Sequence, residues 1–121
     1  MNLQNLTLAF KEFQADTAQT FRDLLSDKCY SDVTLVCDDE VQINLHKVVL
    51  SASSPFFRNI LLKNPHPNPL LYMKGVKHAQ LHSIINFVYL GHTEVAQEEL
   101  DLFLATAREL QIKGLCDENQ S

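Results

Sequence analysis

Residues 46–57 read HKVVLSASSPFF, and the pair Ser54-Pro55 near the end of this stretch marks where a helix starts. A serine hydroxyl accepts a hydrogen bond from a free N–H of the first helical turn, and proline is tolerated at the first helical position because its missing N–H would be unpaired there anyway. We therefore predict a helix that begins at Pro55. Residues 46–53 are too short a segment for their own pattern to decide between helix and strand.

The predicted helix must end near Asn64, because three prolines follow it. Pro65, Pro67 and Pro69 cannot donate backbone hydrogen bonds, and each biases the preceding residue away from the helical conformation. Residues 64–69 are therefore predicted to form a stiff loop. The apolar residues that the helix carries are Phe56, Phe57, Ile60 and Leu61.

Two short strands are predicted upstream of this helix. Residues 32–37 and 41–45 are mostly apolar or β-branched, and the acidic turn Asp38-Asp39-Glu40 separates them. Strands joined by so short a turn favour an antiparallel hairpin. The residues expected to face inward on the second strand are Val41, Ile43 and Leu45.

The N-terminal residues show two different apolar periods. Residues 6–10 alternate apolar and small or polar side chains, which predicts a strand with one buried face. From residue 13 to about 26 the spacing becomes three and four, which predicts an amphipathic helix. Its apolar stripe consists of Phe13, Thr17, Phe21 and Leu24 or Leu25.

Four elements are predicted after the proline loop. A strand over 70–73 precedes a helix that Gly91 ends, an extended piece follows over 93–96, and a last helix has Gly114 as its C′ residue. The apolar faces of the two helices are Leu81, Ile84, Ile85 and Val88, and Leu100, Phe103, Leu104, Ala107 and Leu110. Residues 6–116 thus form one α/β unit with helices in the majority, and the tail 117–121 is expected to fray.

The composition is that of one globular domain and excludes several functions. The 121 residues fall within the usual domain size of ~100–150 residues. Lys+Arg 10 against Asp+Glu 15 leave a net charge of −5, so we expect no direct contact with nucleic acid. No apolar run approaches the ~20 residues that span a bilayer, so we expect no membrane partner. The odd set Cys29, Cys37 and Cys116 lacks C-x-x-C spacing and favours a reducing compartment.

No pattern supports catalysis. The three glycines stand alone, so no glycine-rich phosphate loop is present. His78 and His82 could share a helix face, as a metal site requires, but no third ligand stands at a recognisable spacing. Acids at a turn such as Asp38-Asp39-Glu40 are usually solvated, and no cysteine sits in a thiol-enzyme signature. We predict that the chain is not an enzyme and holds no metal or cofactor.

Three motifs spread along the chain together resemble the BTB/POZ domain. They are Asp32-Val33-Thr34-Leu35, the stretch 46–57 quoted above, and Phe87-Val88-Tyr89-Leu90-Gly91. The order of the predicted elements is similar to that of the family over residues 6–116. The resemblance implies an α+β fold in which a small, mostly antiparallel sheet is flanked by a cluster of helices.

Residues 64–71 and 110–115 resemble the tramtrack group of arthropod-type transcription factors. Proteins of that group carry this domain at the N-terminus and a DNA-binding segment, often zinc fingers, downstream. The resemblance implies a nuclear transcription regulator, of which this chain is a part, that forms homodimers or larger assemblies such as a hexamer. It also implies pairing with related BTB domains and binding of corepressor peptides. Where the group commonly has tryptophan followed by asparagine, this chain has Phe10-Lys11, which leaves the larger assembly open.

The same resemblance implies a dimer interface on the first strand and the first helix. Its residues are Leu6, Leu8 and Phe10 on the strand, and Phe13, Phe21 and Leu24 on the helix. The residues themselves leave two alternatives open, because an apolar N-terminal strand needs a sheet edge that lies either in its own chain or on a second chain.

Asp32 and Lys47 match a charged pocket at the dimer groove of zinc-finger BTB domains, where corepressor peptides dock in some members. The alternative is a structural ion pair in which each charge neutralises the other. His46 is predicted to be a packed, hydrogen-bonded histidine.

Other BTB families are substrate adaptors for cullin-type ubiquitin ligases and tend to carry a hydrophobic-x-Glu pattern near the third helix. Residues 56–63 contain Arg58 and Lys63 but no acid. Self-association of a transcription regulator is therefore the leading hypothesis, and the adaptor is the alternative.

Overall fold

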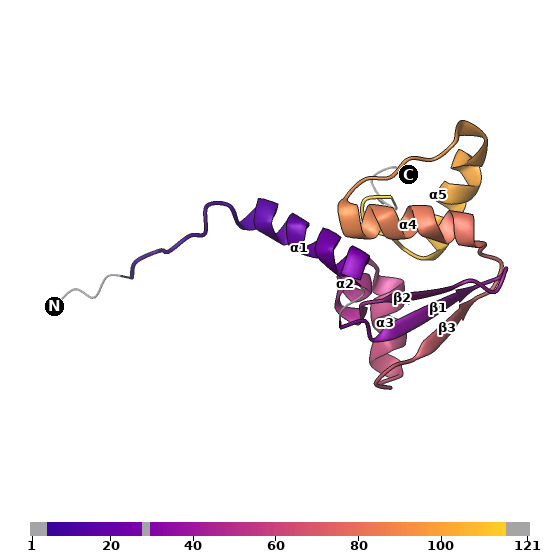
Figure 1. Cartoon of the computed structure of the whole chain (residues 1–121), viewed down its shortest axis with the longest axis horizontal. Coiled ribbons are helices and arrows are strands. Elements are labelled where there is room, and N and C mark those ends of the chain that lie inside the picture. The colour runs from indigo at the N-terminus through magenta and orange to yellow at the C-terminus, as the bar shows by residue number, and fades with distance from the viewer. Residues whose placement is uncertain (1–4, 28–29, 116–121) are drawn as a thin grey trace.

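The helix start predicted at Ser54 is present in the computed structural model, which describes residues 5–27 and 30–115. The Ser54 hydroxyl accepts a hydrogen bond from the N–H of Phe57 at 3.1 Å. Residues 47–53, which the sequence left undecided, are helical. The elements in chain order (Figure 1) are α1 (Phe13–Asp27), β1 (Val33–Cys37), β2 (Gln42–Leu45), α2 (Lys47–Ser53), α3 (Pro55–Lys63), β3 (Leu70–Met73), α4 (His78–Leu90), the 3₁₀ turn η1 (Gln97–Glu99) and α5 (Leu100–Glu109).

The three strands form one mixed sheet in the order β2-β1-β3. β1 and β2 are the predicted antiparallel hairpin, with Leu35 opposite Ile43. β3 runs parallel to β1, with Leu35 opposite Leu71. After β2 reverses direction, α2 and α3 carry the chain to the far side of β1, where β3 starts in the direction of β1. The α+β fold class is confirmed, but the sheet is mixed rather than mostly antiparallel.

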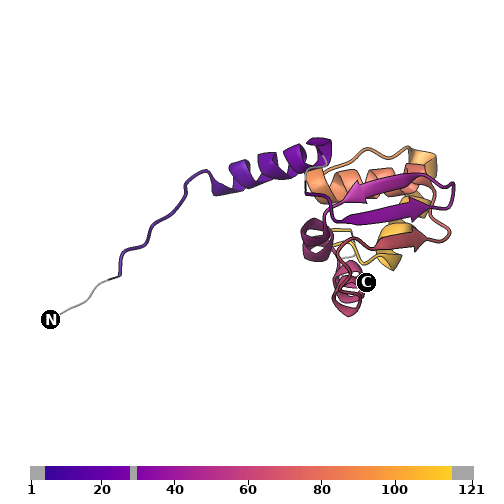
Figure 2. The same ribbon diagram turned by 60° about the horizontal axis from the view of Figure 1, so that its bottom comes forward.

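The core lies between one face of the sheet and the helices. Figure 2 shows α4 and α5 behind the sheet. β1 alternates buried and partly exposed side chains, as a strand covered on one face does, and the buried ones are Val33, Leu35 and Cys37. On β2 only Leu45 is fully buried and Ile43 is half-buried. Val41 lies just before the strand, which begins at Gln42, and is exposed.

The predicted strand over residues 6–10 does not form in the single chain. Residues 5–10 belong to no helix or strand and extend away from the body of the protein (Figure 1). An extended segment becomes a strand only when a neighbouring strand supplies backbone hydrogen bonds, and no strand of the described chain lies beside it. The predicted helix that follows is α1, which starts at Phe13 and packs its far end near α4.

The predicted end of the last helix is also wrong. α5 ends at Glu109, and the left-handed C′ residue is Gln111, with φ 55°, rather than Gly114. The N–H groups of Gln111 and Ile112 donate to carbonyls of the last helical turns at 3.1 and 3.0 Å, which is the Schellman pattern. Ile112 is thereby buried, and this burial offsets the strain of a non-glycine residue in that conformation. Gly91 ends α4 as predicted.

Of the three cysteines, the structure describes Cys37, which is buried and free. Burial raises the pKa of its thiol and so favours the protonated form. Cys29, Cys116 and the tail 117–121 lie outside the described residues. No helix within 5–27 or 30–115 is long and apolar enough to cross a membrane.

Candidate functional site

The six residues of the predicted interface fall into two groups. Phe21 and Leu24, on the second half of α1, are half-buried against the core of their own chain. The other four remain exposed, at 86% for Leu6, 91% for Leu8, 60% for Phe10 and 59% for Phe13. The structure therefore leaves the apolar residues of the first strand and the first helical turn uncovered.

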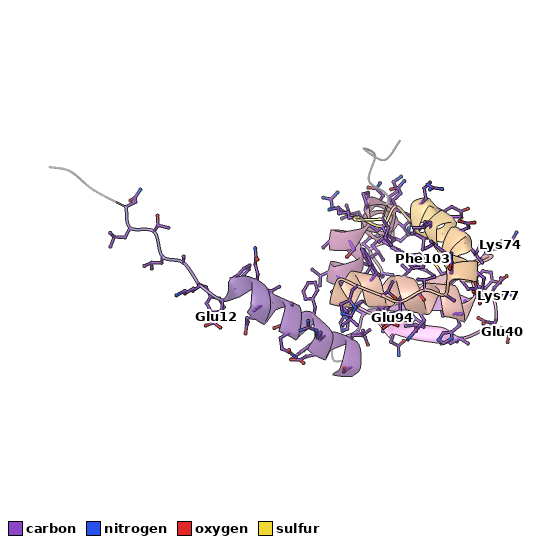
Figure 3. All side chains as sticks on the ribbon, turned by 90° about the horizontal axis from the view of Figure 1, so that it is seen from above. Glu12, Glu40, Lys74, Lys77, Glu94 and Phe103 are labelled. Atoms are coloured by element: carbon purple, nitrogen blue, oxygen red, sulfur yellow. The ribbon has the colours of Figure 1, made fainter. Side chains whose placement is uncertain are left out.

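The first half of α1 stands clear of the body. Figure 3 shows Glu12 at the far end of this helix, away from Lys74, Lys77 and Glu40, which lie together at the opposite end of the molecule. The rings of Phe10 and Phe13 pack edge to face, with centroids 6.2 Å apart, so the uncovered apolar surface is continuous across the helix start. An isolated helix of this length is marginal in water, because most helical stability comes from packing an apolar face.

A second unpaired segment lies between α4 and α5. Residues 93–96, predicted to be extended, belong to no strand. Within the part of the chain that the structure describes, none of their N–H groups donates to a backbone carbonyl. A hollow of about 400 Å³ opens beside them, and its lining includes Phe87, Val95 and Leu104. Free N–H groups next to an apolar hollow are suited to the addition of a strand.

Asp32 and Lys47 meet through the backbone of Lys47. The Asp32 carboxylate accepts a hydrogen bond from the Lys47 N–H at 2.8 Å and thereby caps α2, whose N-cap residue His46 makes no side-chain cap bond. The Lys47 ammonium donates to the carbonyl of His66 in the proline loop at 2.5 Å. These hydrogen bonds give each of the two side chains a partner of its own. Both line a hollow of about 370 Å³ together with Arg58.

The prediction of a packed, hydrogen-bonded His46 is confirmed. His46 is 3% exposed, and its backbone N–H donates to the hydroxyl oxygen of Tyr89 at 2.9 Å. The same hydroxyl lies 2.9 Å from Nδ1 of the imidazole. Burial raises the pKa of the Tyr89 phenol well above its usual range, so the hydroxyl stays protonated. This contact ties the start of α2 to α4.

The acidic and histidine residues that were weighed for catalysis or metal binding contact neighbouring residues of the fold. Asp38 accepts a hydrogen bond from the Tyr72 hydroxyl at 2.6 Å, and this bond is the main cause of the lowered pKa of Asp38. Asp39 accepts the backbone N–H of His78 at 3.1 Å, at the start of α4. The rings of His78 and His82 have centroids 5.7 Å apart, and no three His, Cys, Asp or Glu side chains among the described residues are arranged to hold a metal ion.

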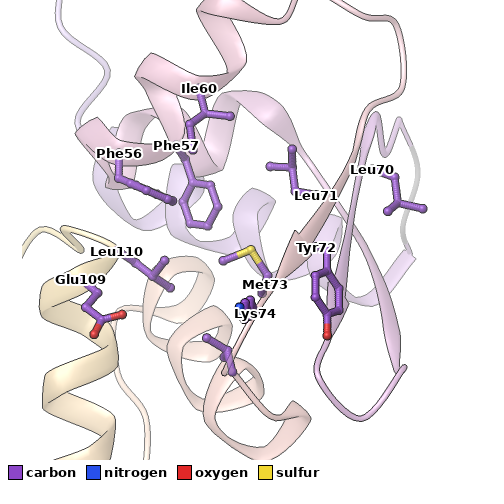
Figure 4. Close-up of a pocket in the computed structure, with 11 residues that line it drawn as sticks. Phe56, Phe57, Ile60, Leu70, Leu71, Tyr72, Met73, Lys74, Glu109 and Leu110 are labelled. Atoms are coloured by element: carbon purple, nitrogen blue, oxygen red, sulfur yellow. The ribbon is translucent and has the colours of Figure 1, made fainter.

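Sequence reasoning missed the outer edge of β3. In the described sheet nothing pairs with β3 on the side away from β1, and Leu70 and Tyr72 are 58% and 57% exposed. A hollow of about 350 Å³ opens between β3, α3 and the end of α5 (Figure 4). The sequence feature that could have indicated it is the run Leu70-Leu71-Tyr72-Met73, in which all four residues are apolar or aromatic. A strand with one solvent-exposed face usually alternates apolar and polar residues.

Comparison with known proteins shows relatives along almost the whole chain. The sequence pattern of the BTB/POZ domain matches residues 21–121. The Longitudinals lacking protein-like of Drosophila melanogaster is 40% identical over 94% of this chain and 89% of its own length. Protein abrupt and Protein tramtrack, alpha isoform, of the same species are 40% and 34% identical over 96% and 98% of this chain. The chain spans only 13% and 14% of the lengths of those two proteins.

The fold is shared with a solved structure. The BTB domain of human gigaxonin superposes with a TM-score of 0.78 over 95% of this chain and 94% of that one, at 20% sequence identity. This likeness shows the fold, and the sequence matches show the relationship. The resemblance predicted from the sequence is therefore confirmed, and the chain belongs to the BTB/POZ family of protein–protein interaction domains.

Proposed function

We propose that this domain joins two copies of a longer nuclear transcription regulator into a homodimer. The observation that carries the proposal is the uncovered apolar surface at the N-terminus, formed by Leu6, Leu8, Phe10 and Phe13. Burying one large apolar side chain contributes ~1.5–3 kcal/mol, and two-fold symmetry presents the set twice. Such a surface is sufficient to make folding and association of the two copies interdependent.

The two unpaired segments suggest how the copies meet. The α1 helices pack their apolar faces together, and residues 5–10 of each copy lie along residues 93–96 of the other. The segment then gains the strand partners that it lacks among the described residues of its own chain, and its apolar side chains fill the hollow lined by Val95 and Leu104. The sequence left open whether the N-terminal strand pairs within its own chain or with a second chain. In this proposal it pairs with the second chain.

The role in the longer protein follows from valency. The chain spans 12% and 13% of the fruitless and abrupt proteins, so most of such a protein lies outside this domain. The net charge of −5 suits a segment that leaves DNA binding to the rest of the chain. Joining two DNA-binding segments raises the effective concentration of the second once the first has bound, which favours clustered sites.

The hollow at Asp32 and Lys47 is the proposed site for a corepressor peptide. Lys47 and Arg58 are the two cationic residues of its lining, while Asp32 is held in the cap of α2. A peptide carboxylate is therefore the group that this hollow receives best. Related BTB domains are proposed as further partners through the same α1 surface.

Molar mass tests the proposal directly. Light scattering on a size-exclusion column should give about twice 13.8 kDa for the wild-type chain, with the Phe10→Ala/Phe13→Ala variant shifted toward the monomer at low concentration. Leu102→Ala is the matched control, because Leu102 is 55% exposed on α5 and lies outside the proposed interface. A wild-type chain that stays monomeric at every concentration contradicts the proposal.

The adaptor alternative has its own readout. α3 carries Arg58 and Lys63 and no acid, so it lacks the acidic pattern of cullin adaptors. Pull-down with the N-terminal domain of a cullin should recover none of this chain. Stable, stoichiometric recovery would move the assignment to the adaptor class.

A further inference from the structure

The two segments that the proposed exchange brings together carry opposite charges. Residues 5–11 hold one charged residue, Lys11, and residues 93–96 hold one, Glu94. Both are exposed. Within residues 5–27 and 30–115 neither side chain has a hydrogen-bond or ion-pair partner. Both charges are therefore available to a second copy.

Lys11 and Glu94 of one chain lie too far apart to meet. Figure 3 shows Glu94 on the body of the protein and Glu12, the neighbour of Lys11, at the outer end of α1. The 15 residues of α1 separate Lys11 from the body, and a helix of that length spans about 22 Å. An ion pair needs the two charged groups within about 4 Å of each other. Contact between these charges therefore requires two copies of the chain.

Residues 93–96 alternate in exposure like a strand with one covered face. Thr93 and Val95 are half-buried and line the hollow of about 400 Å³, whereas Glu94 and Ala96 are exposed. Glu94 therefore lies on the outer face of this segment, away from the hollow.

The incoming segment of the second copy alternates in the same way. In the proposed exchange its apolar side chains enter the hollow, and these are Leu6, Leu8 and Phe10. The residues between them, and Lys11 after them, then point to the outer face. Because residues opposite each other in paired strands share a face, Lys11 and Glu94 lie on the same side of the exchanged pair.

The register that pairs the most residues brings the two charges within reach. Antiparallel pairing with Leu8 opposite Val95 matches all of residues 93–96 and places the small side chain of Ala9 opposite Glu94. Lys11 is then the diagonal neighbour of Glu94. Diagonal neighbours lie about 7–8 Å apart, a distance that long side chains bridge.

We propose that Lys11 of each copy forms an ion pair with Glu94 of the other copy, and that these two pairs select the partner chain. The inference rests on the proposed homodimer and its exchanged segments. An exposed ion pair adds little stability, but like charges in the same place repel, so the contact acts mainly on partner choice. It accepts a chain with a cation at the position of Lys11 and an anion at the position of Glu94. A second copy of this chain meets both conditions.

Charge reversal on the whole chain tests the inference. The dissociation constant of the dimer, measured by sedimentation equilibrium over a dilution series, should rise about tenfold in Lys11→Glu and in Glu94→Lys, because each change makes two attractive pairs repulsive. The double variant Lys11→Glu/Glu94→Lys should return to within about threefold of the wild type. Lys63→Glu, the same change of charge at an exposed position of α3, is the matched control and should dimerise as the wild type does.

Mixing the two single variants gives a sharper readout. A dimer of one Lys11→Glu chain and one Glu94→Lys chain has an attractive pair on both sides, so mixed dimers should outnumber both homodimers. Native mass spectrometry with one variant isotopically labelled counts the three species. A general effect of net charge would differ, because Lys11→Glu makes the chain more negative and would weaken association, whereas Glu94→Lys would strengthen it.

The failure of this inference is distinguishable from the failure of the proposed homodimer. Single variants that dimerise as the wild type does, or a double variant as weak as the singles, overturn the ion pair and leave the homodimer intact. An equal loss in Lys63→Glu also overturns it, because net charge would then control association. A wild-type chain that stays monomeric overturns both. Urea midpoints of dilute samples show that each variant folds, since the changed residues are exposed.

Discussion

Phe13 and Phe57 are the same side chain in two regions with opposite surroundings. Phe57, on α3, is 1% exposed and packs in the core, whereas Phe13, at the start of α1, is 59% exposed. The body around Phe57 is held by contacts within one chain. The region around Phe13 also carries large apolar side chains, and they find no cover in the described chain. An apolar pattern therefore shows that a residue needs a partner, without showing which chain provides it.

The largest expected effect separates these two phenylalanines. Phe57→Ala should lower the free energy of unfolding by about 3–5 kcal/mol, because it removes a buried ring and leaves a cavity. Phe13→Ala, measured at low concentration, should change it by less than about 0.5 kcal/mol. Urea unfolding followed by circular dichroism measures both. Equal losses in the two variants would mean that Phe13 is buried in the monomer.

Tyr89→Phe should have the next largest effect, because the body depends on its contact with His46. The variant removes the hydroxyl that accepts the buried His46 N–H, which should cost about 1–3 kcal/mol of unfolding free energy. Retention of full stability in the same urea assay would show that another group replaces this acceptor.

The pH dependence sharpens the Tyr89 prediction. Burial raises the pKa of this phenol in the folded chain, so the unfolded chain ionises first, above about pH 10. The stabilisation is therefore full below that pH and is lost as pH rises further. Urea midpoints from about pH 9 to about pH 11 should fall less steeply for Tyr89→Phe than for the wild type. If the urea midpoints of the two proteins fell in parallel with rising pH, ionisation of Tyr89 would not be the cause of the loss of stability at alkaline pH.

Ser54→Ala tests the hydroxyl that caps the start of α3. The hydroxyl caps α3 and also donates to the carbonyl of Leu110 at 2.5 Å, which ties α3 to the end of α5. Its removal should cost about 1–2 kcal/mol. Ser26→Ala, at an exposed position of α1, is the matched control and should leave the urea midpoint unchanged. A comparable loss in both variants would point to serine replacement in general rather than to the cap.

Patterns formed by residues adjacent in the sequence correctly predicted most elements that surround the core. The hairpin 32–45, the helix start at Ser54-Pro55 and the stop at Gly91 each depend on a few adjacent side chains and their backbone preferences. The elements whose structure differs from the prediction depend on residues that are distant in the sequence. The parallel pairing of β3 depends on the path through α2 and α3, and the helix end at Gln111 depends on burying Ile112.

The candidate site was predictable in part for the same reason. The sequence indicated that Leu6, Leu8 and Phe10 need the edge of a sheet, and the described residues of the chain do not supply one. The family resemblance implied that Asp32 and Lys47 lie in one pocket, but not that the contact uses the Lys47 N–H, because a cap depends on where a helix begins in space. The edge of β3 was missed because strand order is a property of the assembled sheet.

The smallest expected change in the free energy of unfolding is at Leu8, the most exposed of the interface residues. Leu8 is 91% exposed, so Leu8→Ala should leave the urea midpoint of a dilute sample within about 0.5 kcal/mol of the wild type. At high concentration the midpoint of the wild type should rise above that of the variant, because association stabilises only the folded state and Leu8 lies in the proposed interface. A difference that is independent of concentration would place the contacts of Leu8 within its own chain. The N-terminal region and the core around Phe57 would then both be stabilised by contacts within one chain, and no second copy would be needed.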